Sequence, residues 1–280
     1  MNFTPYQPSA TISPYIESIF HYSEFYPDHS IERVVPTGHL FIIFELDGIT
    51  RYTYDANSLK PNAEFSKAWI SGMHKNFISI SAHENSEMFV VQFKPFGSYP
   101  FLHRNTCDFN EQVIPAHAVV GDELYSLRER MLSSDGAAAK FSLAEDWLLS
   151  RFDSSRVASK ELVNFIGELQ LNPVEGLNDL IDGFPGSQKK LIDDFKRFVG
   201  LTPKSYQRVL RFNDLLKRIQ HKDKITWADI AHDCGYFDQS HFIKEFKYFS
   251  GMNPEEFIQQ DFNKDEPNFF PLDRDASDSE

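Results

Sequence analysis

Residues 239–249 carry two kinds of side chain at helical spacing. With about 100° of turn per residue, Phe242, Phe246 and Phe249 fall on one side of a predicted helix. The opposite side and the first turn carry polar or basic groups, with one tyrosine among them: Gln239, Ser240, His241, Lys244, Lys247 and Tyr248. Asp238, directly before the helix, is a typical N-cap residue.

The polar side suits the chemistry of base edges. Gln pairs with adenine through two hydrogen bonds, Lys pairs with guanine, and Ser can bond several bases. We therefore predict that Gln239, Ser240, His241 and Lys244 read bases and that Lys247 contacts phosphate. The plain alternative is a solvated polar helix face.

Charge is distributed unevenly along the 280 residues. The net charge of −13 argues against nucleic acid as a partner if it is taken as a whole. Residues 1–150 hold 10 Lys and Arg against 18 Asp and Glu, whereas residues 157–262 hold 14 against 16. Between Lys204 and Lys222 there are six basic residues and a single acidic one, Asp214. The acidity therefore belongs mainly to the first half and to the tail.

Periodicity divides the chain into two halves of different class. Residues 39–46 and 86–96 are rich in β-branched and aromatic residues and predict strands, and aromatic alternation appears between 14 and 25. Helical spacing begins near Gly121. We expect an α+β protein, with a β-rich domain at 1–150 that ends in helices, a linker at 151–158, an all-α domain at 159–262 and an acidic disordered tail at 263–280.

An internal repeat organises the second half. Residues 187–206 match residues 238–257 at an offset of 51, which aligns Phe195 with Phe246, Gly200 with Gly251 and Pro203 with Pro254. Each copy reads as an N-cap, an apolar stripe, a helix-ending glycine and a proline at the start of the next helix. A short apolar helix precedes each copy, at 176–184 and 225–236. The sequence thus predicts two helix-turn-helix units, joined by a helix over 203–221.

The second unit carries a resemblance to a known family. From Ile230 to Phe257 it reads IAHDCGYFDQSHFIKEFKYFSGMNPEEF, and over about 157–262 the chain resembles the AraC/XylS family of bacterial transcription regulators. The resemblance implies that the second helix of each unit enters the major groove of DNA. It also implies a sensor or dimerisation half before this module, often a cupin-like β-barrel. "FVVQFKPFGSYPFL" followed by "LYSLRERML" is similar to a subgroup whose ligands are mostly unassigned.

The first unit departs from that pattern. Asp193 stands where the second unit has Lys244, and a carboxylate that faces the groove is repelled by phosphates, although it could accept a hydrogen bond from cytosine. We therefore expect the first unit to contact the DNA backbone and to read few bases. The residues predicted to bind phosphate in or beside it are Lys189, Lys190, Lys196, Arg197, Arg208 and Arg211.

Other functions have weaker support in the sequence. The histidines of the first half form no tight pair with a following Glu, so no metal or cofactor is expected. Cys107 has no obvious activating base, and Cys234 resembles a small core residue, so we do not expect an enzyme. A third alternative is a helix-turn-helix protein that has lost DNA binding and acts only through protein contacts, as the acidic Asp193 and Asp194 would allow.

Together these features predict a cytoplasmic, sequence-specific transcription regulator. Its expected partner is double-stranded promoter DNA, and its expected modulator is a small molecule or a second copy that acts through the first half. RNA polymerase is a further partner if the protein is an activator. No run of about 18 apolar residues occurs, so no membrane association is expected.

Overall fold

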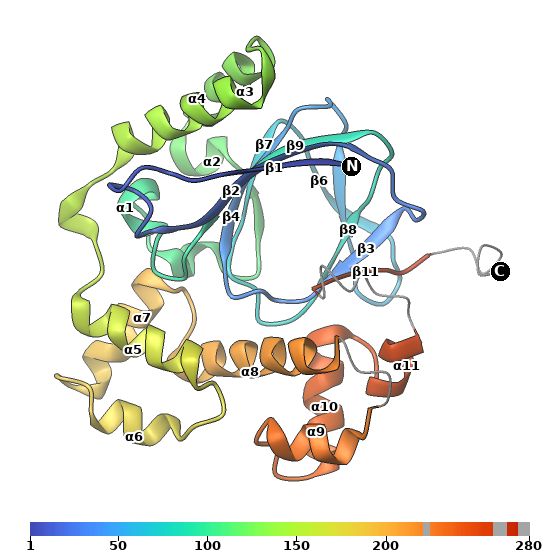
Figure 1. Ribbon diagram of the computed structural model, residues 1–280, viewed down its shortest axis with the longest axis vertical. Helices are drawn as coiled ribbons and strands as arrows, with labels where there is room; N and C mark the ends of the chain where they lie inside the picture. Colours follow the sequence, from blue (N-terminus) through green and yellow to red (C-terminus); the bar gives the residue numbers. More distant parts are fainter. Residues whose placement is uncertain (221–224, 260–267, 274–280) are drawn as a thin grey trace.

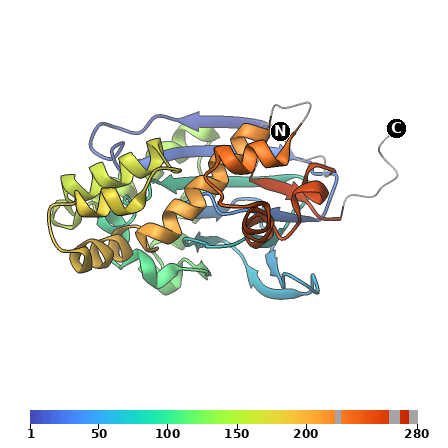
Figure 2. The ribbon, with the colours of Figure 1, turned by 90° about the horizontal axis from the view of Figure 1, so that it is seen from below.

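The computed structural model describes residues 1–220, 225–259 and 268–273. Its first half is β-rich and its second half is helical, so the expected α+β class is confirmed. The two halves lie at opposite ends of the long axis (Figure 1). The long helix over Pro203–Ile219 runs between two groups of helices in both views (Figure 2).

The β-rich half contains two antiparallel sheets. The six-stranded sheet has the order β1 (Asn2–Tyr6), β2 (Ile16–Phe25), β9 (Ser86–Phe93), β4 (Leu40–Glu45), β7 (Ala68–Ser71) and β10 (Val113–Pro115). The five-stranded sheet has the order β11 (Phe269–Pro271), β3 (Ile31–Val34), β8 (Ile78–Ser81), β5 (Arg51–Tyr54) and β6 (Pro61–Phe65). Strands rich in Ile, Phe and Val form the central positions of the larger sheet, as expected for residues that pack on both faces.

Helices cover one face of the larger sheet. They are α1 (Tyr99–Leu102), α2 (His117–Val120), α3 (Glu123–Leu132) and α4 (Gly136–Arg151), with a 3₁₀ turn, η1, at Thr106–Phe109. Phe44 and Phe89 of the sheet share a buried cluster with Leu127 of α3 and Phe141 of α4. The second 3₁₀ turn, η2 (Ser154–Arg156), lies between α4 and the next helix, within the predicted linker.

The helical half repeats one local plan twice. It consists of α5 (Lys160–Leu171), α6 (Leu177–Asp182), α7 (Gln188–Phe198), α8 (Pro203–Ile219), α9 (Trp227–Asp233), α10 (Gln239–Ser250) and α11 (Pro254–Gln259). Below, unit one means α6 with α7 and unit two means α9 with α10. A reciprocal capping pair begins α11, where Asn253 and Glu256 each accept from the other's backbone N–H at 2.9 Å.

The expectation of a disordered tail is wrong for residues 268–273. Phe269–Pro271 form β11, which pairs antiparallel with β3, so the chain returns to the β-rich half after the helical half. Asp273 accepts hydrogen bonds from the backbone N–H groups of Ser30 and Ile31, at 3.0 and 2.8 Å. Phe270 is buried and packs on Phe257 of α11, with ring centroids 5.1 Å apart. Apolar burial and strand pairing order this segment, despite its acidic composition. The rest of the predicted tail lies outside the described residues.

Candidate nucleic-acid interface

Helix α10 has the ends and the buried side that the repeat predicts. The Asp238 carboxylate accepts a hydrogen bond from the backbone N–H of His241 at 2.7 Å, which caps the helix. At the other end Gly251 adopts φ of +75°, in the left-handed region that favours glycine. Phe242, Phe246 and Phe249 are at most 1% exposed. The opposite side of α10 is thereby turned to solvent.

All four residues predicted to read bases are exposed. Gln239, Ser240, His241 and Lys244 lie along the first turn and a half of α10, and Lys247 follows one turn later. The His241 ring packs edge-on against Tyr236, with centroids 5.5 Å apart, and its Nε2 lies 3.6 Å from Glu245. His241 is thus oriented by its neighbours, whereas Lys244 and Lys247 form no ion pair with any residue that the structure describes.

Glu245 holds α10 in place, a role that the sequence analysis did not predict. Its side chain is 2% exposed and accepts from Arg208 Nε and Arg211 Nη2, each at 2.6 Å. A buried carboxylate of this kind requires a cation partner. The signal was available, because Glu245 falls at the i+3 position after Phe242, on the buried side of α10. Two charge-assisted bonds therefore tie α10 to α8.

This pairing changes the expected roles of Arg208 and Arg211. Both were predicted to bind phosphate, but their guanidinium groups are engaged within the protein. Arg211 is only 18% exposed at its side chain and lies over the Tyr236 ring, whereas Arg208 is 38% exposed and lies over Tyr248. Their first role is to hold α10 in place. Phosphate contact by their remaining donors stays a prediction.

Helix α7 of unit one repeats the frame with a different surface. Ser187 caps it by accepting from the backbone N–H of Lys190 at 3.2 Å, and Gly200 follows it with φ of +89°. The predicted phosphate ligands on it are all exposed: Lys189, Lys190, Lys196 and Arg197. Asp193 is exposed as well, and Lys190 Nζ pairs with Asp194 at 2.6 Å. This helix presents charges of both signs, and neutral hydrogen-bonding side chains are sparse on it.

Side chains of the β-rich half form hydrogen bonds with both units. In each unit they contact the end of the second helix and the turn that follows it. In unit one, Thr106 Oγ1 donates to the carbonyl of Phe198 at 2.9 Å, and Asn110 Nδ2 donates to the carbonyl of Gly200. In unit two, Arg33 Nη1 donates to the carbonyl of Ser250 at 3.2 Å while its guanidinium lies over the Phe77 ring. Backbone carbonyls that a helix end leaves free are thus satisfied from the other half.

Helix α8 is held between these two points. Asn213 Nδ2 donates to the carbonyl of Pro36 at 2.8 Å, and Asn268 Nδ2 donates to Asn213 Oδ1 at 2.7 Å. A Cβ added at Gly38 would meet the Tyr206 ring at 3.2 Å, which shows how closely the backbone of the first half approaches α8. Val35, Met73 and Phe270 belong to the same buried cluster as the cores of both units.

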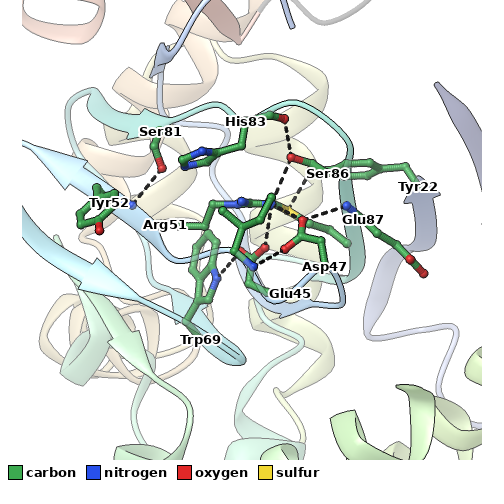
Figure 3. A network of polar contacts seen from close by, with 12 residues as sticks. Tyr22, Glu45, Asp47, Arg51, Tyr52, Trp69, Ser81, His83, Ser86 and Glu87 are labelled. Atoms are coloured by element: carbon green, nitrogen blue, oxygen red, sulfur yellow. Dashed lines mark hydrogen bonds and ion pairs between the residues drawn. The ribbon is translucent and has the colours of Figure 1, made fainter. Parts of the chain in front are cut away.

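The space between the two sheets holds a polar network (Figure 3). Glu45 is fully buried, with Trp69 Nε1 donating to it at 2.8 Å and Arg51 Nη2 lying 3.1 Å away. Burial raises the pKa of the Glu45 carboxyl to about 7, and the charge of Arg51 opposes that rise. Arg51 also pairs with Asp47 at 2.5 Å. The network links strands of both sheets.

The described residues offer little for metal or thiol chemistry. No group of three or more His, Cys, Asp or Glu within 1–220, 225–259 and 268–273 is arranged to hold a metal ion. Burial raises the pKa of the Cys234 thiol to about 11, and burial together with Asp108 raises that of Cys107. Neither thiol is therefore activated as a thiolate. No helix in this part of the chain has the length and apolar character needed to span a membrane.

The helical half matches known proteins in sequence. Residues 184–260 match a family described as a helix-turn-helix domain. Over 103 residues the chain is 32% identical to the HTH-type transcriptional activator RhaS of Pectobacterium carotovorum, a match that covers 36% of this chain and 37% of the relative. The C-terminal region is an AraC-type helix-turn-helix domain. The chain is also 32% identical over 75 residues to the HTH-type transcriptional activator RhaR of Klebsiella pneumoniae, a match that covers 27% of this chain and 26% of the relative.

These relatives are matched over only part of their length. The chain spans 37% of the length of this RhaS and 26% of the length of this RhaR. Residues 4–115 match a separate family described as a domain of unknown function, DUF6597. A solved structure of ToxT from Vibrio cholerae aligns over 92% of this chain and 98% of that chain, with 12% identity and a TM-score of 0.44. ToxT from Vibrio cholerae O395 aligns over 86% and 97%, with 11% identity and a TM-score of 0.44.

Proposed function

We propose that this protein is a sequence-specific DNA-binding transcription regulator whose β-rich half controls how its AraC-type domain engages a promoter. The observation that carries the proposal is the duplicated helix-turn-helix frame, in which each second helix turns its apolar side inward and its basic and polar side to solvent. Such helices enter the major groove and contact base edges near their N-termini. The activity belongs with DNA in the cytoplasm and requires no catalytic group.

Helix α8 connects the two units rigidly, as simultaneous contact with one face of DNA requires. Helix α8 has 17 residues, which corresponds to about 25 Å at 1.5 Å per residue. Successive major-groove faces on one side of B-DNA lie about 34 Å apart. Helix α7 packs on the first turn of α8 at Tyr206, and α10 is tied to α8 at Arg208 and Arg211, so this one connector fixes the distance between the two recognition helices.

The two units have different proposed roles. In unit two, Gln239, Ser240, His241 and Lys244 read bases, while Lys247 binds phosphate. In unit one the exposed basic residues of α7 bind the backbone, since Asp193 occupies the place of Lys244. Base contacts specify a sequence, and phosphate contacts position the protein without specifying one.

The β-rich half is proposed to act as the sensor or dimerisation part. A small molecule can change DNA binding only if it has different affinities for the arrangements that bind DNA well and poorly. The contacts from Thr106 and Asn110 to unit one, and from Arg33 to unit two, give such a change a physical route. An effector that binds tightly without shifting DNA affinity would contradict this part of the proposal.

The decisive experiment is selection of random duplex DNA by the full-length protein at two salt concentrations, with Lys244→Ala beside the wild type. A recovered motif that loses one position in the variant supports specific readout by unit two. A binding constant that falls steeply with salt supports phosphate contacts. If neither motif nor salt-dependent binding is found, the protein acts through protein contacts instead.

A further inference from the structure

Phe237 is the most exposed of the large hydrophobic side chains in the part of the chain that the structure describes. Its exposed fraction is 94%, against 79% for Leu171, the next in that set. Single exposed apolar residues are common on protein surfaces, so exposure alone says little. The position of Phe237 matters more, because it lies immediately before the N-cap of the recognition helix of unit two.

Phe237 does not have the intramolecular role that its position normally provides. A hydrophobic residue just before an N-cap often packs on the fourth helical residue and fixes the entry of the chain. Here that fourth residue is Phe242, and Tyr236 packs on it instead, with ring centroids 5.3 Å apart. Phe237 therefore leaves its ring in solvent without serving the fold.

The backbone that presents Phe237 is firmly held on one side. Tyr236 is 6% exposed, its N–H donates to the carbonyl of Ala231 at 2.9 Å, and Arg211 lies 4.5 Å from its ring centroid. On the other side, Asp238 caps α10. A ring displayed from a fixed backbone loses little conformational freedom when it meets a partner.

The internal repeat makes this feature specific to unit two. The equivalent position in unit one, 51 residues earlier, is Gly186, which has no side chain. The aromatic ring is thus present on the unit whose helix carries the predicted base-reading residues and absent from the unit that carries mainly charges.

We infer that Phe237 reads a thymine methyl group in the major groove, at the edge of the bases contacted by α10. This inference rests on the proposed DNA-binding function and adds a specificity-determining residue to it. The thymine C5-methyl is the apolar feature of the major-groove edge, and Phe is among the side chains that contact it. The N-terminal end of a recognition helix is the part that meets base edges, so a ring two residues before Gln239 falls within the same contact area.

The test uses the duplex that the full-length wild-type protein selects from a random pool. Each thymine in it is replaced in turn by deoxyuridine, which removes only the methyl group, and affinities are measured for wild type, Phe237→Ala and Phe237→Leu. The position that Lys244→Ala loses marks the half-site of unit two. Leu171→Ala serves as the matched control, since it also removes an exposed apolar side chain but lies on α5.

We expect wild type to lose about fourfold in affinity at one thymine of that half-site, the value for one buried methyl-sized group. Phe237→Ala should bind the unmodified site roughly tenfold more weakly and should be insensitive to the same replacement. Phe237→Leu should retain the methyl preference, and Leu171→Ala should behave as wild type. Thermal unfolding of Phe237→Ala should be unchanged, because the ring is almost fully exposed.

Two results would overturn the inference and leave the proposed function standing. One is a wild-type protein that selects a motif but is indifferent to every thymine methyl in the unit-two half-site. The other is Phe237→Ala that discriminates thymine from uracil as wild type does. Absence of both a selected motif and salt-dependent binding would instead remove the proposed function, and this inference with it.

Discussion

Units one and two share a frame and differ in what they place on it. Both begin their second helix at a side-chain cap, bury a stripe of apolar residues and end at a glycine with positive φ. The exposed side of α7 in unit one carries charges of both signs. The exposed side of unit two carries polar and basic side chains and the exposed ring of Phe237. A repeat can therefore conserve the residues that build a helix-turn-helix while its two copies diverge at the surface that meets a partner.

The anchoring of the two recognition helices differs as well. Helix α10 is tied to α8 through a buried carboxylate, Glu245, whereas the acidic residue at the same place in α7, Asp194, pairs with an exposed lysine on its own helix. The unit that is proposed to read bases is thus the one whose helix is fixed by buried charge-assisted bonds. Fixed geometry is what base recognition through paired hydrogen bonds requires.

The largest expected effect comes from removing the buried anchor. Glu245→Ala should lower the free energy of unfolding by about 3 kcal/mol, since it leaves Arg211 largely buried without its partner. Asp194→Ala in unit one should cost at most about 0.5 kcal/mol, because Lys190 is 59% exposed. Urea unfolding of the two variants measures the difference. Equal losses would mean that the anchoring of the two helices is not different after all.

A second comparison concerns DNA. Lys244→Ala should cost about 1–3 kcal/mol of binding free energy at one base pair of the site and leave other positions unchanged. Lys189→Ala should weaken binding to all sequences alike and reduce the salt slope by about one. Competition binding with a panel of single-base variants, repeated at two salt concentrations, separates the two patterns. Loss of sequence preference in Lys189→Ala would show that unit one also reads bases.

Much of this frame could be predicted from sequence because its signals are local. A helix cap involves two residues that lie three apart in the chain. A glycine that ends a helix involves one backbone angle, and the repeat is found at a fixed offset of residues. The contacts that join the halves involve residues far apart in the chain, such as Arg33 with Ser250 and Asn110 with Gly200, and no periodicity encodes them. The acidic composition of the tail led to a wrong prediction of disorder for residues 268–273. In the structure Phe270 is buried in an apolar environment, and β11 pairs with β3.

The contacts between the β-rich half and each unit can be tested at Gly200 and Gly251, the glycines that follow the second helix of each unit. Gly200→Ala and Gly251→Ala should each cost about 1–2 kcal/mol for placing alanine in the left-handed region. The total cost should exceed this backbone contribution, because the new Cβ at Gly200 would meet Asn110 Oδ1 at 2.6 Å and the new Cβ at Gly251 would meet Arg33 and Phe77. Gly48→Ala is the control, since Gly48 has φ of +77° and nothing within 4 Å of the added atom.

Unfolding and limited proteolysis of these three variants would isolate the contribution of the docking contacts. Gly200→Ala and Gly251→Ala should expose the region between the halves to protease, and Gly48→Ala should not. Similar losses in all three variants would mean that the backbone angle accounts for the whole effect and that the two units are not held through these turns.

The smallest expected effect concerns the acidic residue that distinguishes the two recognition surfaces. Asp193 is exposed on α7, at the place that Lys244 occupies on α10. Replacing it by Asn removes a negative charge that would face phosphate and keeps the size of the side chain, so affinity should rise a few-fold for all sequences. Asp146→Asn, an exposed change of the same charge on α4, should raise affinity less, because screening weakens charges far from the DNA. Binding to the selected duplex and to a scrambled one measures both variants. If Asp193→Asn instead lowered affinity for the selected duplex alone, Asp193 would be accepting a hydrogen bond from a cytosine, and unit one would be a reader in its own right.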